Sequence, residues 1–154
     1  MEELLQQVRD IVADSGSLKI VSTLNENGTI HSAPKGSLKV NEAGQLEYVE
    51  VLESSSSYKN VVRSLWFDKK VTVLVIGVDK RSYEITGNIK RILTSGRHFE
   101  NAYKAILEKR GFGIAAVIQI DVESVADLDI SKGIERQKRE HFFFTHLDRL
   151  AVQE

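Results

Sequence analysis

The chain contains no cysteine among its 154 residues. This absence excludes disulfide bonds, thiolate nucleophiles and zinc sites built from cysteine. Any redox chemistry must therefore come from a bound cofactor. The four histidines do not follow the usual spacings of metal ligands, so we expect no metal site; they are His31, His98, His141 and His146.

Long apolar runs and an excess of charge of one sign are also missing. The longest strongly apolar run, residues 71–78, is too short to span a bilayer, and the N-terminus has no apolar signal core. The 21 basic and 22 acidic side chains nearly balance, which gives no general attraction to nucleic acid or anionic membranes. We therefore expect a cytoplasmic protein without a nucleic-acid or membrane partner.

The composition is that of one globular domain covering residues 1–154. Hydrophobic residues make up 42% of the chain and charged residues 28%, so the chain can bury a core and is not predicted to be disordered.

The hydrophobic periodicity predicts helices over residues 3–13, 58–67, 99–109 and 134–150. It predicts six strands, over residues 18–24, 29–40, 45–52, 70–78, 81–93 and 114–122. Turn signals at 25–28 and 41–44 join the first three strands, which makes them antiparallel. The expected fold is mainly β within the α+β class: a six-stranded antiparallel barrel, with its core at about 17–128, flanking helices and an extra C-terminal helix.

A run of serines, residues 54–57, lies where a strand ends and a helix begins. Free backbone N–H groups and the positive end of the dipole make a helix N-terminus suitable for an anion. The hydroxyls of Ser55, Ser56 and Ser57 add donors, and Lys59 and Arg63 add charge. The pattern indicates a phosphate site; the alternative is a flexible loop whose last serine only caps the helix.

Basic residues also recur along the predicted strand 29–40. His31, Lys35 and Lys39 are four residues apart, so a continuous strand would place all three on one face, together with Ser37. That face would suit a phosphate or the edge of an anionic flavin ring. The alternative is a polar strand that faces solvent.

The order and pattern of residues 17–128 resemble the pyridoxamine 5'-phosphate oxidase-like FMN-binding split barrels. The segments that carry this resemblance are VSTL (21–24), TIHSAP (29–34), GQLEY (44–48), SSSSYK (54–59), KVTVL (70–74), YEITGNI (83–89) and IAAVI (114–118). Many members of the family have arginine or lysine at positions matching Ala33 and Ser56, and the oxidase's C-terminal substrate-binding segment has no counterpart here. Vitamin B6 oxidation is therefore not expected.

The resemblance implies a homodimer with flavin mononucleotide (FMN) at the subunit interface. By position, segments 33–39 and 55–59 would hold the phosphate and ribityl chain. The flavin ring would lie along residues 35–37 and near Val51, and Tyr83 would approach it. Taken together, the two arguments give these cofactor-binding residues: Lys35, Gly36, Ser37, Lys39, Val51, Ser55, Ser56, Ser57, Lys59 and Tyr83. Of these, Gly36, Val51 and Tyr83 are implied by the resemblance alone.

The function implied is an FMN-dependent oxidoreductase or electron carrier, with NAD(P)H or a small redox substrate as its partner. In such a fold a deazaflavin or haem can replace FMN. Two alternatives stay open: a non-catalytic flavin-binding or sensing protein, and a degenerate split barrel that acts only as a dimeric binding module. No residue stands out as a catalytic acid or base.

Overall fold

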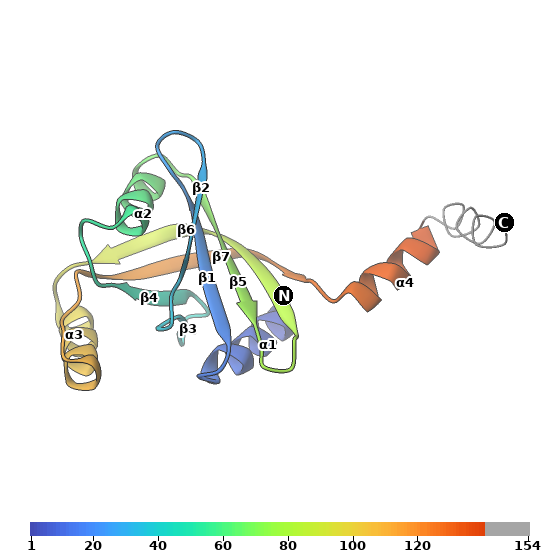
Figure 1. The fold of residues 1–154 in the computed structure, drawn as a ribbon, viewed down its shortest axis with the longest axis horizontal. Helices are drawn as coiled ribbons and strands as arrows, with labels where there is room; N and C mark the ends of the chain where they lie inside the picture. Colours follow the sequence, from blue (N-terminus) through green and yellow to red (C-terminus); the bar gives the residue numbers. More distant parts are fainter. Residues whose placement is uncertain (141–154) are drawn as a thin grey trace.

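A computed structural model describes residues 1–140, which form four helices and one seven-stranded sheet (Figure 1). The helices are α1 (Glu2–Ala13), α2 (Ser56–Trp66), α3 (Arg97–Arg110) and α4 (Ile130–Glu140). The strands are β1 (Leu18–Leu24), β2 (Ile30–Pro34), β3 (Lys39–Val40), β4 (Leu46–Glu50), β5 (Lys70–Ile76), β6 (Ser82–Leu93) and β7 (Ala116–Asp127).

The sheet is antiparallel throughout and runs in the order β2-β1-β5-β6-β7-β4-β3. Its two edge strands, β2 and β3, follow one another in the chain and are joined only by residues 35–38. Such a short connection forces the two edges together, so the sheet curls into a half-barrel (Figure 1). The predicted α+β antiparallel split barrel is confirmed.

The prediction of one continuous strand over residues 29–40 is wrong, because this segment forms two strands joined by a turn. The Leu38 N–H donates to the Lys35 carbonyl at 3.1 Å, which closes a tight turn that bends the chain, and β3 then pairs with β4. This break raises the strand count from six to seven. It also separates the three basic residues expected on one face: His31 lies on β2, Lys35 in the turn and Lys39 on β3.

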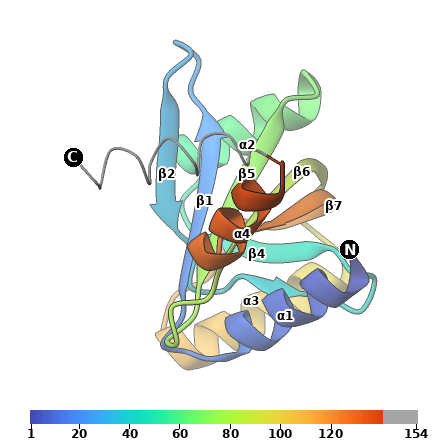
Figure 2. The ribbon, with the colours of Figure 1, turned by 90° about the vertical axis from the view of Figure 1, so that its right-hand side faces the viewer.

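The core fills the concave side of the sheet. Alternate residues of β1, β5 and β6 point inward, as the burial of Val21, Val73 and Ile85 shows. Helix α1 closes this side with Val8 and Ile11, which its helical spacing places on one face, and α1 lies across one end of the sheet (Figure 2).

The C-terminal helix begins earlier than the sequence predicts. Helix α4 starts at Ile130 instead of residue 134 and projects from the end of β7, away from the sheet (Figure 1). The rest of the predicted helix, residues 141–150, lies outside the described residues. None of the described helices is long and apolar enough to cross a membrane.

Candidate functional site

A cavity of about 320 Å³ lies where the turn 35–37, the end of β4, the start of α2 and the end of α3 meet. Aliphatic and aromatic side chains form much of its wall: Pro34, Val49, Val51, Leu52, Ile106 and Phe112. The rest of the cavity lining is polar or charged, apart from one glycine, and consists of Lys35, Gly36, Ser37, Glu50, Ser55, Lys109 and Arg110. We call this space the cation-ringed cavity. An apolar wall with a few convergent polar groups is typical of a cofactor site.

A buried ion pair lies at the base of this cavity. Lys35 Nζ is 3.0 Å from Glu50 Oε2, and the Glu50 side chain is only 2% exposed. The Ser57 hydroxyl donates to Glu50 Oε1 at 2.6 Å, and Lys35 Nζ lies 5.7 Å from the centre of the Tyr48 ring. Burial, followed by the negative charge of Glu50, raises the pKa of the Tyr48 hydroxyl well above its ordinary value. Because Lys35 compensates the negative charge of Glu50, this carboxylate would repel a bound anion only weakly.

Positive charge exceeds negative charge around the cavity. Lys109 and Arg110 occupy the last turn of α3, and Lys19 approaches from β1, where its Nζ donates to the Gly36 carbonyl at 3.1 Å. Burial lowers the pKa of Lys19 below its ordinary value, and the positive charge of Lys109 lowers it further. The repulsion between these two lysines would be relieved by a bound anion.

The first turn of α2 supplies further donors. The Ser55 hydroxyl caps the helix by accepting from the Tyr58 N–H at 3.0 Å. The backbone N–H groups of Ser56 and Ser57 are the first two of the helix and have no acceptor within it. The start of α2 therefore adds backbone donors and a positive partial charge beside the cavity.

The structure brings together only part of the predicted site. Residues from the turn, the strand end and the cap line the cation-ringed cavity: Lys35, Gly36, Ser37, Val51 and Ser55. Ser57 is buried next to it, bonded to Glu50.

The remaining predicted residues lie elsewhere. Ser56 and Lys59 line a separate hollow of about 330 Å³ with Arg63, beside the turn between β1 and β2. Tyr83 is buried at the start of β6, where its hydroxyl donates to Gln7 Oε1 of α1, and it lines a third hollow. Lys39 extends over Glu47, outside the cavity.

Sequence reasoning missed the cations that come from distant parts of the chain. The predicted helix 99–109 includes Lys109 and ends before Arg110, and nothing in the local sequence links these two residues to the segments 33–39 and 55–59. Lys19 did give a signal. It occupies an inward position of a strand whose other inward residues are Val21 and Thr23, and a lysine in such a place needs a buried partner.

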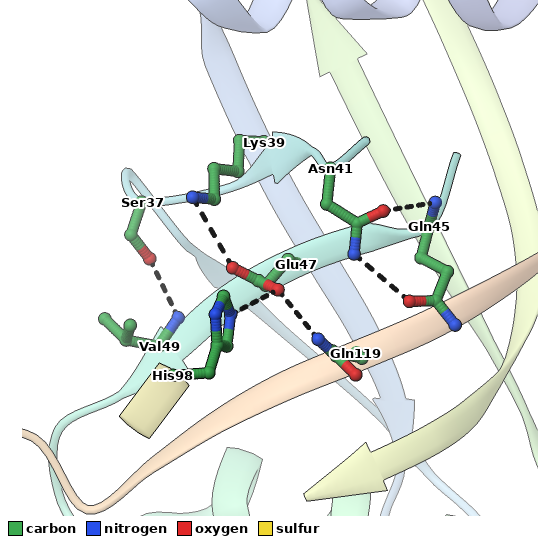
Figure 3. A network of polar contacts seen from close by, with 8 residues as sticks. All are labelled: Ser37, Lys39, Asn41, Gln45, Glu47, Val49, His98 and Gln119. Atoms are coloured by element: carbon green, nitrogen blue, oxygen red, sulfur yellow. Dashed lines mark hydrogen bonds and ion pairs between the residues drawn. The ribbon is translucent and has the colours of Figure 1, made fainter. Parts of the chain in front are cut away.

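A second polar group of residues surrounds Glu47, on the other side of β4 (Figure 3). Glu47 Oε1 accepts from Gln119 Nε2 at 2.9 Å and lies 3.0 Å from His98 Nε2, while Lys39 Nζ is 3.5 Å from Oε2. Burial alone would raise the pKa of Glu47, but the hydrogen bonds and the positive charges of His98 and Lys39 outweigh it. The pKa of Glu47 is therefore lowered. We call this group the Glu47 cluster.

Comparisons with known proteins find matches to solved structures but none to family models or curated proteins. An FMN-binding protein from Syntrophomonas wolfei superposes with a TM-score of 0.69 at 15% identity, over 83% of this chain and 88% of that one. The chain has the split-barrel fold.

Two other structures agree with this assignment. The HupZ protein of Group A Streptococcus gives a TM-score of 0.66 at 22% identity, over 80% of this chain and 92% of that one. A pyridoxamine 5'-phosphate oxidase-like protein from Listeria innocua gives 0.62 at 17% identity, over 82% and 98%. These matches confirm the resemblance of the split barrel to FMN-binding and pyridoxamine 5'-phosphate oxidase-like proteins at the level of the fold.

Proposed function

We propose that this split barrel is an FMN-binding flavoprotein that acts as an oxidoreductase or electron carrier. The observation that supports this proposal most is the cation-ringed cavity, whose lining combines an apolar wall with Lys35, Lys109, Arg110 and a single, already paired carboxylate. Lys19 adds a further cation, bonded to the carbonyl of the lining residue Gly36.

The residues present fit the two ends of the cofactor. The cavity volume lies in the range of small-molecule sites, about 300–1,000 Å³. Val51, Leu52 and Phe112 would pack against the flavin ring, while Lys109 and Arg110, with the first N–H groups of α2, would hold the phosphate.

When bound, FMN supplies the hydride or electron transfer that this cysteine-free chain cannot perform itself. The role of the protein would be electrostatic. Lys19, Lys109 and Arg110 would place positive charge beside the site, which would stabilise a flavin that gains negative charge on reduction, whereas the charge of Lys35 is compensated by Glu50. We propose NAD(P)H or a small redox molecule as the reaction partner.

Among the described residues that line this cavity, none is a histidine, cysteine, methionine or tyrosine. These are the side chains that ligate haem iron most often. The lining therefore favours a flavin over haem at this position, and a deazaflavin with a phosphate would meet the same cations.

We also propose a homodimer. On the outer face of the sheet, Leu18 and Ile76 lie opposite one another, and Ile20 lies opposite Leu74. Leu18 is 57% exposed and Ile30 of β2 is 73% exposed. Since the opposite face of the same strands is packed in the core, a second copy would bury an apolar face that is otherwise open to solvent.

Fluorescence titration of the flavin-free protein with FMN and with riboflavin tests the proposal. Riboflavin lacks the phosphate, so we expect FMN to bind at least about tenfold more tightly, from the charge-assisted contacts alone. Changing Lys109→Ala and Arg110→Ala together should weaken FMN binding by about 10- to 1,000-fold and leave riboflavin almost unchanged.

A matched control is available at the end of α4, where Lys138 and Arg139 also occupy the last turn of a helix. Replacing that pair by alanine should leave both affinities unchanged. If neither flavin binds, or if both bind equally in all variants, the proposal is wrong.

Analytical ultracentrifugation tests the homodimer separately. Leu18→Glu with Ile30→Glu changes two exposed side chains, so the subunit should remain folded and sediment as a monomer. Dimers of undiminished stability in this variant would exclude the outer face as the interface.

A further inference from the structure

The helix that carries Lys109 and Arg110 packs loosely. None of the residues of α3 is buried, although the helix is 14 residues long. Most helices in proteins are fixed by a buried apolar face, and a helix without one opens more easily. Nevertheless, Ile106, Lys109 and Arg110 of this helix form one wall of the cation-ringed cavity. Something other than core packing must therefore fix the position of that wall.

The start of α3 is fixed by the Glu47 cluster. His98 lies in the first turn, and its Nε2 is 3.0 Å from Glu47 Oε1. The Glu47 side chain is only 4% exposed, and Gln119 of the neighbouring strand β7 holds its orientation (Figure 3). The acceptor thus belongs to the sheet, whereas the imidazole belongs to the helix and is half exposed. A buried carboxylate held in this way gives a directional attachment point for an otherwise loosely packed helix.

The connections at the two ends of α3 add local order without joining the helix to the sheet. Gly96 and Gly111 have φ angles of +94° and +81°, values that favour glycine. The ring of Tyr103 lies against Gly113, so closely that a Cβ on Gly113 would come within 2.4 Å of it. Tyr103 therefore packs on the segment that follows its own helix. The His98–Glu47 contact remains the polar link between the first turn of α3 and the sheet.

We propose that His98 and Glu47 are positioning residues of the flavin site. Their contact fixes the start of α3 against β4, and the continuous helix carries this placement to Lys109, 11 residues further on and roughly 16 Å along the axis. The cations that would meet the phosphate are thus placed by a contact outside the cavity. This proposal rests on the proposed FMN-binding function, because it concerns the cations that would bind the phosphate of FMN.

Two measurements on His98→Ala test this. In the flavin-free protein, amide hydrogen exchange in α3 should become faster by about tenfold or more, while exchange in α1 stays unchanged. The affinity for FMN should fall by about tenfold, whereas that for riboflavin changes by less than about twofold, because only the phosphate meets Lys109 and Arg110. His98→Gln, which keeps an N–H donor, should restore both properties in large part, and Arg97→Ala, the exposed neighbour, should behave as the wild type.

The outcomes separate the two proposals. Unchanged exchange of α3 in His98→Ala would overturn the positioning role, whatever the protein binds. Faster exchange with an unchanged preference for FMN over riboflavin would also overturn it. A wild-type protein that binds neither flavin would instead refute the proposed function, and the exchange measurement would still decide whether His98 holds the helix. If His98→Ala does not fold, Glu47→Gln serves in its place, because it weakens the same contact and keeps the shape of the side chain.

Discussion

Two buried glutamates, Glu47 and Glu50, lie three residues apart on β4 and have different roles. Because side chains alternate along a strand, Glu47 and Glu50 project to opposite faces. Glu50 is bonded to Lys35, whose side chain is only 14% exposed, and to the buried Ser57. Glu47 is bonded to groups that reach it from the surface, since the side chains of His98 and Lys39 are 52% and 62% exposed.

This difference shows that burial of a carboxylate does not by itself define its role. The partners of Glu50 are themselves largely shielded from solvent, so the pair is part of the fold and of the cavity wall. The partners of Glu47 are side chains with water around them, so the same residue type acts there as an attachment point. The two sites should therefore respond very differently when one partner is removed.

The largest effect is expected from Lys35→Met in the flavin-free protein. This change leaves Glu50 buried without its cation, which should lower the free energy of unfolding by about 3–5 kcal/mol. Urea denaturation at neutral pH measures it. Adding Glu50→Leu to the same chain should recover most of the loss, because no unpaired charge then remains. If the free energy of unfolding of Lys35→Met alone lies within about 1 kcal/mol of the wild-type value, the Lys35–Glu50 pair does not behave as a buried ion pair.

Ser57→Ala should have the next largest effect. It removes the hydroxyl that donates to Glu50 at 2.6 Å, so we expect a loss of about 1.5–3 kcal/mol in the free energy of unfolding. Ser56→Ala, at the exposed neighbouring position, is the matched control and should stay within about 0.5 kcal/mol of the wild type. Equal effects of the two variants would contradict the assignment of Ser57 to the ion pair.

Glu47→Gln should lower stability by about 1–2 kcal/mol at neutral pH, and the loss should depend on pH. The pKa of Glu47 is lowered in the folded protein from an ordinary value of 4.5. Its contribution is therefore complete above the ordinary value and is lost as the pH falls through the folded-state pKa. Thermal or urea unfolding of both chains should show a difference that shrinks as the pH falls below 4.5. A difference that persists unchanged down to about pH 3 would contradict this account.

Lys39→Ala should have the smallest effect, about 0–1 kcal/mol, because an exposed lysine loses conformational freedom when it forms an ion pair. The small contribution should also decrease in 1 M salt, which screens exposed charges. A loss as large as that of Lys35→Met would mean that both lysines belong to equally buried pairs.

The fold could be predicted from the sequence because its signals are local. Alternating apolar residues defined the strands, and the turns ending in Gly28 and Gly44, both with positive φ, fixed their antiparallel order. The break inside the predicted strand 29–40 has only one local signal: Pro34, at which the edge strand β2 ends, cannot donate to a sheet. Residues 37–40 still alternate between polar and apolar, and the turn depends on β3 pairing with β4.

The candidate site was predictable only where it is continuous in sequence. Lys35, Gly36 and Ser37 are neighbours, and Ser55 belongs to a recognisable helix cap. Lys109 and Arg110 come from α3 and line the cavity, and Lys19 of β1 bonds the lining residue Gly36, so only the fold of the whole chain brings them together. The resemblance to split barrels places Tyr83 near the flavin ring, whereas in this structure it lies under α1 and lines a different hollow.

A crystal structure of the protein grown with FMN tests the central claim most directly. Our account predicts the phosphate beside Lys109, Arg110 and the first turn of α2, with the flavin ring against Val51 and Leu52. Electron density for the flavin in the hollow beside the Glu47 cluster, or in the hollow of Ser56 and Lys59, with the cation-ringed cavity filled by water alone, would contradict it.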